Sequence, residues 1–206
     1  MKLLFVDNYD SFSYNVVHLL ASQGASVRFM HADDPQLTVA TLAEVEGMAI
    51  GPGPGRPSDT PMLARLIAAA LARDLPTLGI CLGQQAIGET LGARVIHAPR
   101  PMHGKSDAIL HEGRGLFAAL PNPFQATRYH SLALEEGSLP DSIEIHARSS
   151  DGVVQGIAVA GKRCFGLQFH PESVLSECGE PLVANFLALA SASGVALGGL
   201  DSFGDL

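Results

Sequence analysis

Hydrophobic residues occur along this chain in short runs that are separated by turn-forming residues, a pattern typical of alternating strands and helices. Residues 2–6 form the first apolar run and predict a strand. Residues 14–22 predict a helix that stops at Gly24, and residues 26–30 predict a second strand. Because a helix between two short apolar strands forms a right-handed crossover, we expect a parallel sheet in this half of the chain.

The same alternation continues toward the middle of the chain. Residues 47–50 predict a short strand, and residues 61–73 predict a helix that begins with a proline. Residues 75–80 form an apolar run entered through Pro76, which predicts a buried strand. A helix-length segment follows directly and ends near Gly92. We therefore expect two further strands in the parallel sheet, the second leading straight into a helix.

The pattern changes after Gly92. Alternating residues and hairpin-sized gaps, such as the one at Gly161, favour antiparallel strands. The predicted strands cover residues 94–97, 106–111, 125–129, 143–148, 153–160 and 162–169. A last helix is predicted at residues 180–192, and the glycine-rich, acidic residues 193–206 are predicted to be a loose tail. The expected fold is α/β, a doubly wound and mostly parallel sheet flanked by helices, with an antiparallel extension in the C-terminal half.

Composition agrees with one globular domain, which we place at residues 1–192. The chain has 206 residues, of which 47% are apolar and 17% charged, enough for a sizeable core. Its net charge of -8 and scattered basic residues argue against a nucleic-acid or anionic-membrane surface. The first strand is too short for a signal peptide or a membrane span. Three cysteines without metal-type spacing favour a reducing compartment over a disulfide framework, so we expect a cytoplasmic protein.

Candidate chemistry begins at Cys81, at the junction of a predicted strand and a predicted helix. Gly79 and Gly83 lie two positions before and two positions after it, the spacing of a strand-to-helix elbow in which side chains would collide with the turned backbone. A thiol at a helix N-terminus is favoured as the nucleophilic thiolate. Taken by itself, this short pattern fits a buried, unreactive cysteine equally well.

A partner for this thiol occurs near the other end of the chain. A predicted interior strand runs into His170, Pro171 and Glu172. Proline favours an extended conformation for the residue before it, so the His170 and Glu172 side chains should point the same way. Seen alone, they would be a structural histidine and a solvated glutamate. Together with Cys81 they predict a nucleophile, a base and a group that orients the base.

These residues resemble the class I (triad) glutamine amidotransferase family. The resemblance rests on residues 79–85 and 166–173 and extends from Lys2 to about Leu189. Residues 5–12, 51–57 and 102–105 narrow it to the glutaminase subunits of the synthases that make anthranilate or 4-amino-4-deoxychorismate from chorismate. No single stretch is specific, but the combination is.

The resemblance implies a role for each matching residue. It implies Cys81, His170 and Glu172 as the catalytic triad. It implies that the backbone N–H groups of Gly53 and Leu82 stabilise the oxyanion, and that Gln85, Ser131 and Leu132 bind substrate. The segments implied to contact a synthase partner contribute Asn8, Tyr9, Asp10, Ser11, Met102, His103 and Lys105.

Two positions depart from the family pattern. Relatives usually carry serine at Gly51 and histidine at Gln84. We expect the first to affect the stiffness of the loop and the second to tune the pocket without loss of the chemistry. The loop itself is not a phosphate cradle, because its prolines lack N–H donors and no Lys-Ser or Lys-Thr pair follows.

The resemblance implies hydrolysis of L-glutamine through a cysteine thioester. Ammonia would then reach a separate large subunit (component I), where chorismate is aminated with magnesium present. We expect neither a cofactor nor a metal in this chain, since its other histidines lack ligand spacing. The tryptophan and folate pathways, or a role shared between them, are not distinguished. A free-standing cysteine hydrolase of another amide or γ-glutamyl compound and a catalytically silent interaction subunit stay open.

Overall fold

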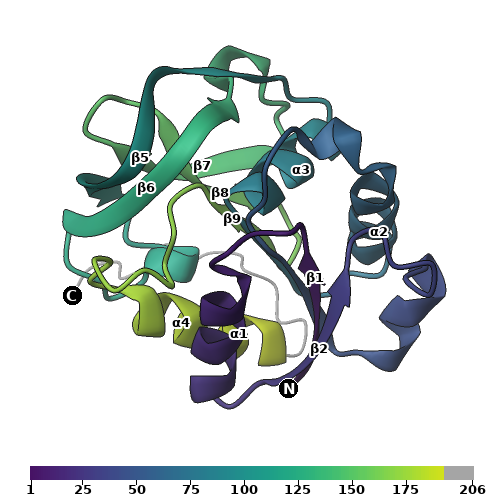
Figure 1. Ribbon diagram of the computed structural model, residues 1–206. Helices are drawn as coiled ribbons and strands as arrows, with labels where there is room; N and C mark the ends of the chain where they lie inside the picture. Colours follow the sequence, from purple (N-terminus) through teal and green to yellow (C-terminus); the bar gives the residue numbers. More distant parts are fainter. Residues whose placement is uncertain (193–206) are drawn as a thin grey trace, which may run out of the picture.

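Across residues 1–192, the part of the chain that the computed structural model describes, a single nine-stranded sheet runs through the molecule (Figure 1). Its strand order is β2-β1-β3-β4-β9-β8-β7-β5-β6. The strands are β1 (Lys2–Asp7), β2 (Ser26–His31), β3 (Gly47–Ile50), β4 (Thr77–Ile80), β5 (Val95–His111), β6 (Phe124–Leu134), β7 (Ile143–Ser149), β8 (Val154–Val159) and β9 (Cys164–Leu167). The helices are α1 (Ser13–Ser22), α2 (Pro61–Ala72), α3 (Leu82–Thr90) and α4 (Gly179–Ser191).

The parallel half of the sheet comprises β2, β1, β3, β4 and β9. Alternate residues of β1 face opposite sides: Leu4 packs in one core with α2 and α3, and Phe5 in another with α1 and α4. Helices therefore cover both faces of this half (Figure 1). The predicted doubly wound arrangement is confirmed.

The antiparallel half is formed by β9, β8, β7, β5 and β6. Here one prediction was wrong, because the two strands expected at residues 94–97 and 106–111 are parts of the single strand β5. Its pairing with β6 is interrupted by register shifts between His97 and Met102 and between His103 and Lys105. Prolines and the left-handed Gly104 lie at these bulges, so the strand continues through residues that usually end one.

None of the helices within residues 1–192 has both the length and the apolar character that a membrane crossing requires. The tail predicted at residues 193–206 lies outside the described residues.

Candidate active site

Cys81 occupies a sharp turn between β4 and α3. Its backbone has a φ of 53° and a ψ of -103°, a combination that residues with a side chain seldom adopt. A Cβ atom on Gly79 would lie 2.4 Å from the backbone of Gly83, and one on Gly83 would lie 2.4 Å from the Ile50 carbonyl oxygen. The predicted need for glycine on both sides of Cys81 is therefore confirmed, and the elbow is locked by backbone packing.

The sheet order brings His170 to the same place. Because β9 pairs with β4 in parallel, the segment after β9 leaves the sheet beside Cys81, whose N–H donates to the Leu167 carbonyl at 2.7 Å. The His170 N–H donates to the Thr127 carbonyl at 2.9 Å, which holds this segment extended against β6. His170 Nδ1 lies 2.6 Å from Glu172 Oε1, and both side chains are buried.

The charges of this cluster favour a protonated ring. Burial alone would lower the pKa of His170, but its interactions with Cys81 and Glu172 outweigh that effect and hold this pKa well above the ordinary value. Nδ1 faces Glu172, while Nε2 has no hydrogen-bond partner among the described residues. By contrast, burial raises the pKa of Cys164 to about 12, so that thiol stays protonated. Of these two thiols, only Cys81 has a base beside it.

The two backbone N–H groups predicted to stabilise the oxyanion belong to the start of a helix and to a loop. Leu82 is the first residue of α3, so its N–H has no acceptor within the helix. Gly53 lies in the loop after β3, and a Cβ atom there would come 2.4 Å from the Asn8 Cβ atom. Asn8 Nδ2 also donates to the Gly51 carbonyl at 3.0 Å, which ties the loop to the end of β1. The oxyanion role of Gly53 and Leu82 stays a prediction.

The residues predicted to bind substrate lie next to one another across α3 and β6. Gln85 Nε2 donates to the Leu132 carbonyl at 3.0 Å and to Gln168 Oε1 at 3.1 Å. Both of its N–H groups are used in this way, which leaves its carbonyl oxygen as the free acceptor. Ser131 is half-buried in the same strand. The substrate-binding role of Gln85, Ser131 and Leu132 stays a prediction.

Sequence reasoning assigned no role to Gln168, which lies between Gln85 and Cys81. Its Nε2 donates toward Cys81 Sγ at 3.6 Å, and its side chain is fully buried. The signal that could have revealed it is a long polar residue inside an otherwise apolar predicted strand.

The predicted partner residues separate into two groups. Tyr9, Ser11, His103 and Lys105 are exposed and Asp10 is half-buried. Asn8 and Met102 are each only 7% exposed. These two side chains offer little surface of their own, and the partner role of all seven residues stays a prediction. Asn8 anchors the loop described above.

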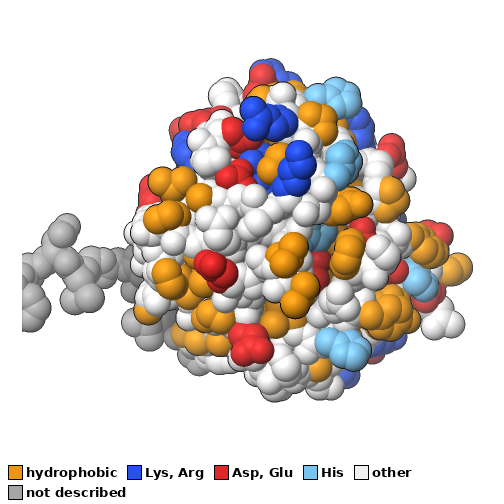
Figure 2. All heavy atoms as spheres, turned by 60° about the vertical axis from the view of Figure 1, so that its left-hand side comes forward, with side chains coloured by type: hydrophobic (Ala, Val, Ile, Leu, Met, Phe, Trp, Pro, Cys, Tyr) orange, Lys and Arg blue, Asp and Glu red, His pale blue; other side chains and the backbone are white. Residues whose placement is uncertain are grey.

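The two exposed stretches meet around Tyr129, whose side chain is 47% exposed. The rings of Phe12 and His103 lie 6.0 and 5.5 Å from its ring, and the His170 ring lies 6.3 Å away. Figure 2 shows the side of the molecule that carries β5 and β6, where charged side chains gather toward the top and hydrophobic ones are spread over the middle. Phe12, His103 and Tyr129, which are far apart in the sequence, thus form one surface beside His170. We call this surface the rim.

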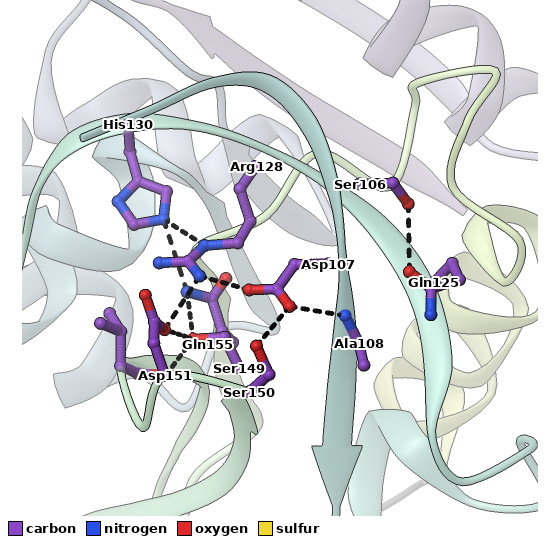
Figure 3. Close-up of polar contacts among 11 residues, drawn as sticks. Ser106, Asp107, Ala108, Gln125, Arg128, His130, Ser149, Ser150, Asp151 and Gln155 are labelled. Carbon is purple, nitrogen blue, oxygen red and sulfur yellow. Dashed lines mark hydrogen bonds and ion pairs between the residues drawn. The ribbon is translucent and has the colours of Figure 1, made fainter. Parts of the chain in front are cut away.

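A second feature missed in the sequence is a buried ion cluster behind this rim (Figure 3). Arg128 is fully buried and its Nη1 contacts Asp107 at 2.5 Å and Asp151 at 2.9 Å. Its Nε donates to His130 Nε2 at 3.2 Å. No local motif marks this cluster, because the two carboxylates lie on other segments of the chain. Only strand register brings them together.

The described residues hold no group of three or more His, Cys, Asp and Glu side chains arranged for a metal ion. At the departure position Gln84, the fully buried side chain donates from Nε2 to the Val154 carbonyl at 3.4 Å, and its Oε1 has no partner among residues 1–192. At Gly51, a Cβ atom would lie 2.6 Å from Phe5 Cζ. A phenylalanine ring therefore occupies the space that a side chain at this position would need.

Comparison with known proteins agrees with this geometry. A family model described as glutamine amidotransferase class-I matches residues 4–190. An anthranilate synthase component 2 from Azospirillum brasilense is 43% identical over 185 residues, which are 90% of this chain and 94% of that protein. An aminodeoxychorismate synthase from Streptomyces griseus is 42% identical over 94% of this chain but only 26% of its own length.

Among solved structures, a protein from Thermoplasma acidophilum that is described as belonging to a GMP synthase superimposes with a TM-score of 0.82. The match covers 92% of this chain and 94% of that chain at 23% sequence identity. At that level of identity the likeness concerns the fold.

Proposed function

The chain belongs to the class-I glutamine amidotransferase family, and we propose that it is the glutaminase subunit of a chorismate-aminating synthase, with anthranilate as the product. The observation that carries the proposal is the strained Cys81 elbow beside the buried pair of His170 and Glu172. The 43% identity to an anthranilate synthase component 2 over most of both chains supports the choice of pathway, tryptophan biosynthesis.

The geometry supports a thioester mechanism. His170 accepts the Cys81 proton while Glu172 orients the ring, and the thiolate attacks the side-chain amide carbon of L-glutamine. The N–H groups of Gly53 and Leu82 stabilise the oxyanion that forms. Protonated His170 then donates its proton to the leaving nitrogen, and ammonia departs. Water hydrolyses the remaining γ-glutamyl thioester to glutamate and regenerates the thiol.

The partner in this proposal is the synthase large subunit, component I, as a separate polypeptide in the cytoplasm, where chorismate is aminated with magnesium present. The rim around Tyr129 is the proposed contact surface, because its exposed residues lie next to His170 and ammonia would have the shortest route there. That all three cysteines are buried and unpaired agrees with a reducing compartment.

Aminodeoxychorismate synthase, in folate biosynthesis, is the second candidate. The Streptomyces griseus relative of that name is 42% identical to this chain, almost as similar as the anthranilate relative. One glutaminase chain shared between both synthases would fit the same observation. That relative is much longer than this chain, so a glutaminase part of this kind also occurs joined to other segments.

The test is product formation from glutamine and chorismate when this chain is mixed separately with each of the two large subunits. We expect anthranilate with the first; aminodeoxychorismate with the second alone would assign the chain to folate synthesis. The Cys81→Ala variant should abolish product from glutamine but not from ammonium salts. Product from neither mixture, while both large subunits work with ammonia and the chain hydrolyses glutamine alone at full rate, would instead indicate a free-standing hydrolase. A Cys81 that no glutamine-like electrophile labels would indicate a silent interaction subunit.

A further inference from the structure

The hydrogen bonds of the buried ion cluster have a fixed donor-to-acceptor direction, and the first donor is Arg128 (Figure 3). A guanidinium can only donate hydrogen bonds. Since Arg128 Nε lies 3.2 Å from His130 Nε2, that ring nitrogen must be the acceptor. Asp107 and Asp151, which are partly exposed, hold the guanidinium in this orientation from the other side.

The orientation of Arg128 determines the tautomer of His130. With Nε2 accepting, the proton of the neutral ring is on Nδ1, which donates to the Leu132 carbonyl at 3.0 Å. The opposite tautomer would point the Nδ1 lone pair at that carbonyl oxygen. Burial, followed by the nearby Arg128 charge, lowers the pKa of His130 to about 4, so the ring is neutral at pH 7.

The same carbonyl of Leu132 also receives a hydrogen bond from Gln85 Nε2 at 3.0 Å. The second N–H of that amide donates to Gln168 Oε1 at 3.1 Å. Gln168 must then turn its own NH2 group toward Cys81 Sγ, 3.6 Å away. A carbonyl oxygen can only accept, so Leu132 fixes the orientation of the Gln85 amide. That amide in turn fixes which end of Gln168 faces the thiol, while His130 holds the Leu132 carbonyl in position.

We propose that this continuous series of contacts makes Arg128 and His130 positioning residues for the nucleophile, and that its last member, Gln168, donates a hydrogen bond that stabilises the Cys81 thiolate. The inference rests on the proposed role of Cys81. An N–H group facing the sulfur favours negative charge there, whereas the amide oxygen in its place would oppose it.

The series begins next to the proposed contact surface. Asp107 lies on β5 two residues beyond Lys105, and Lys105 is paired with Arg128 across the sheet. The contact segment at residues 102–105 thus has a physical connection to the thiol through the strand that carries Tyr129 and His130.

The test measures the rate at which iodoacetamide alkylates Cys81 in the whole chain between pH 5.5 and 9. Peptide mass mapping identifies Cys81 as the alkylated residue. Loss of one charge-assisted hydrogen bond shifts a thiol–thiolate equilibrium by about tenfold or more, and the more basic thiolate regains part of that in nucleophilicity. We therefore expect Gln168→Leu and Arg128→Lys each to slow alkylation at pH 7 by about fivefold and to move the pH profile upward.

Arg148→Lys is the matched control, because Arg148 pairs with the surface residue Glu136 and has no contact with this series. Its alkylation rate should stay within about twofold of the wild-type rate. His130→Asn keeps an N–H near the position of Nδ1 and should react faster than His130→Leu. If Arg128 and Gln168 act in one series, the double variant should be no slower than the slower single variant.

A purely structural role would give a different result. Arg128→Lys would lower the melting temperature while the folded protein reacted at the wild-type rate, and that outcome would overturn the proposal. Independent, multiplying effects of the Arg128 and Gln168 substitutions would also overturn it. Wild-type Cys81 reacting no faster than a free cysteine would overturn the proposed nucleophile itself, which keeps the two failures apart.

Discussion

His170 Nδ1 lies 2.6 Å from Glu172 Oε1 although a proline separates the two residues, and neither side chain is more than 4% exposed. This contact fixes the ring so that Nε2 is the nitrogen left to exchange a proton with Cys81. Glu172→Gln keeps the shape of the side chain but replaces the charge with an amide that can donate to Nδ1. We expect glutamine hydrolysis to fall by about two to four orders of magnitude, because the ring is then held in the wrong tautomer.

Steady-state glutaminase assays of the complex with a synthase large subunit measure this loss. The ammonia-dependent activity of the same complex is the control and should not change. A variant that retains more than about a third of the wild-type kcat would contradict the assignment of Glu172 as the orienting group.

Gly79→Ala should destabilise the fold. Its Cβ atom would lie 2.4 Å from the Gly83 backbone, which cannot yield without moving the elbow. We expect the free energy of unfolding in urea to fall by about 1–3 kcal/mol. Gly137→Ala is the matched control, because no atom lies within 4 Å of a Cβ atom there; it should change stability by less than about 0.5 kcal/mol. Equal effects at both positions would show that packing at the elbow is not the cause.

Gly51→Ser should reveal a coupling with Phe5. The new Cβ atom would lie 2.6 Å from Phe5 Cζ, so serine should cost about 1–3 kcal/mol in the wild-type background. In a Phe5→Leu background the shorter side chain leaves that space open, and the same substitution should cost at least about 1 kcal/mol less. Urea denaturation of the four proteins in this cycle measures the coupling. Additive effects within experimental error would contradict the idea that Phe5 explains the glycine.

His130 should make the protein sensitive to acid. Because its pKa falls from 6.5 to about 4 on folding, the unfolded chain binds the extra proton between these values. This contribution to stability is therefore complete above pH 6.5 and is lost as the pH falls toward 4. The shift corresponds to roughly 3 kcal/mol. His170, whose pKa is raised, acts in the opposite direction and only above pH 6.5.

Urea denaturation of wild type and His130→Asn at pH 7, 5.5 and 4.5 isolates this contribution, because other titrating groups are common to both proteins. The wild type should lose more stability than the variant over that range. Parallel loss in both proteins would show that His130 is not responsible.

Local patterns predicted the parts of the fold that depend on nearby residues. The β4 strand, the Cys81 elbow and the parallel half follow from apolar runs, glycine spacing and the crossover rule. The elbow could be predicted because the constraint on Gly79 and Gly83 comes from backbone atoms of adjoining elements. The shared orientation of His170 and Glu172 followed from the intervening proline alone.

The errors and omissions concern contacts between distant segments. Strand β5 was divided in two because bulges tolerate prolines that usually end a strand. The burial of Asn8 and Met102 depends on neighbouring loops, which no pattern specifies. The ion pairs of Arg128 depend on strand register, which places Asp107 and Asp151 beside it from 21 and 23 positions away.

The place of β9 in the sheet also bears on how the chain is made. Of the strands within residues 1–192 it leaves the ribosome last, yet it lies between β4 and β8 and joins the two halves of the sheet. Until it is inserted, both halves expose unpaired edges, a state prone to aggregation. Since His170 lies just beyond the end of β9 at Leu167, a nascent chain carries the Cys81 thiol without its base until that point. The nucleophile is complete only once the sheet has closed.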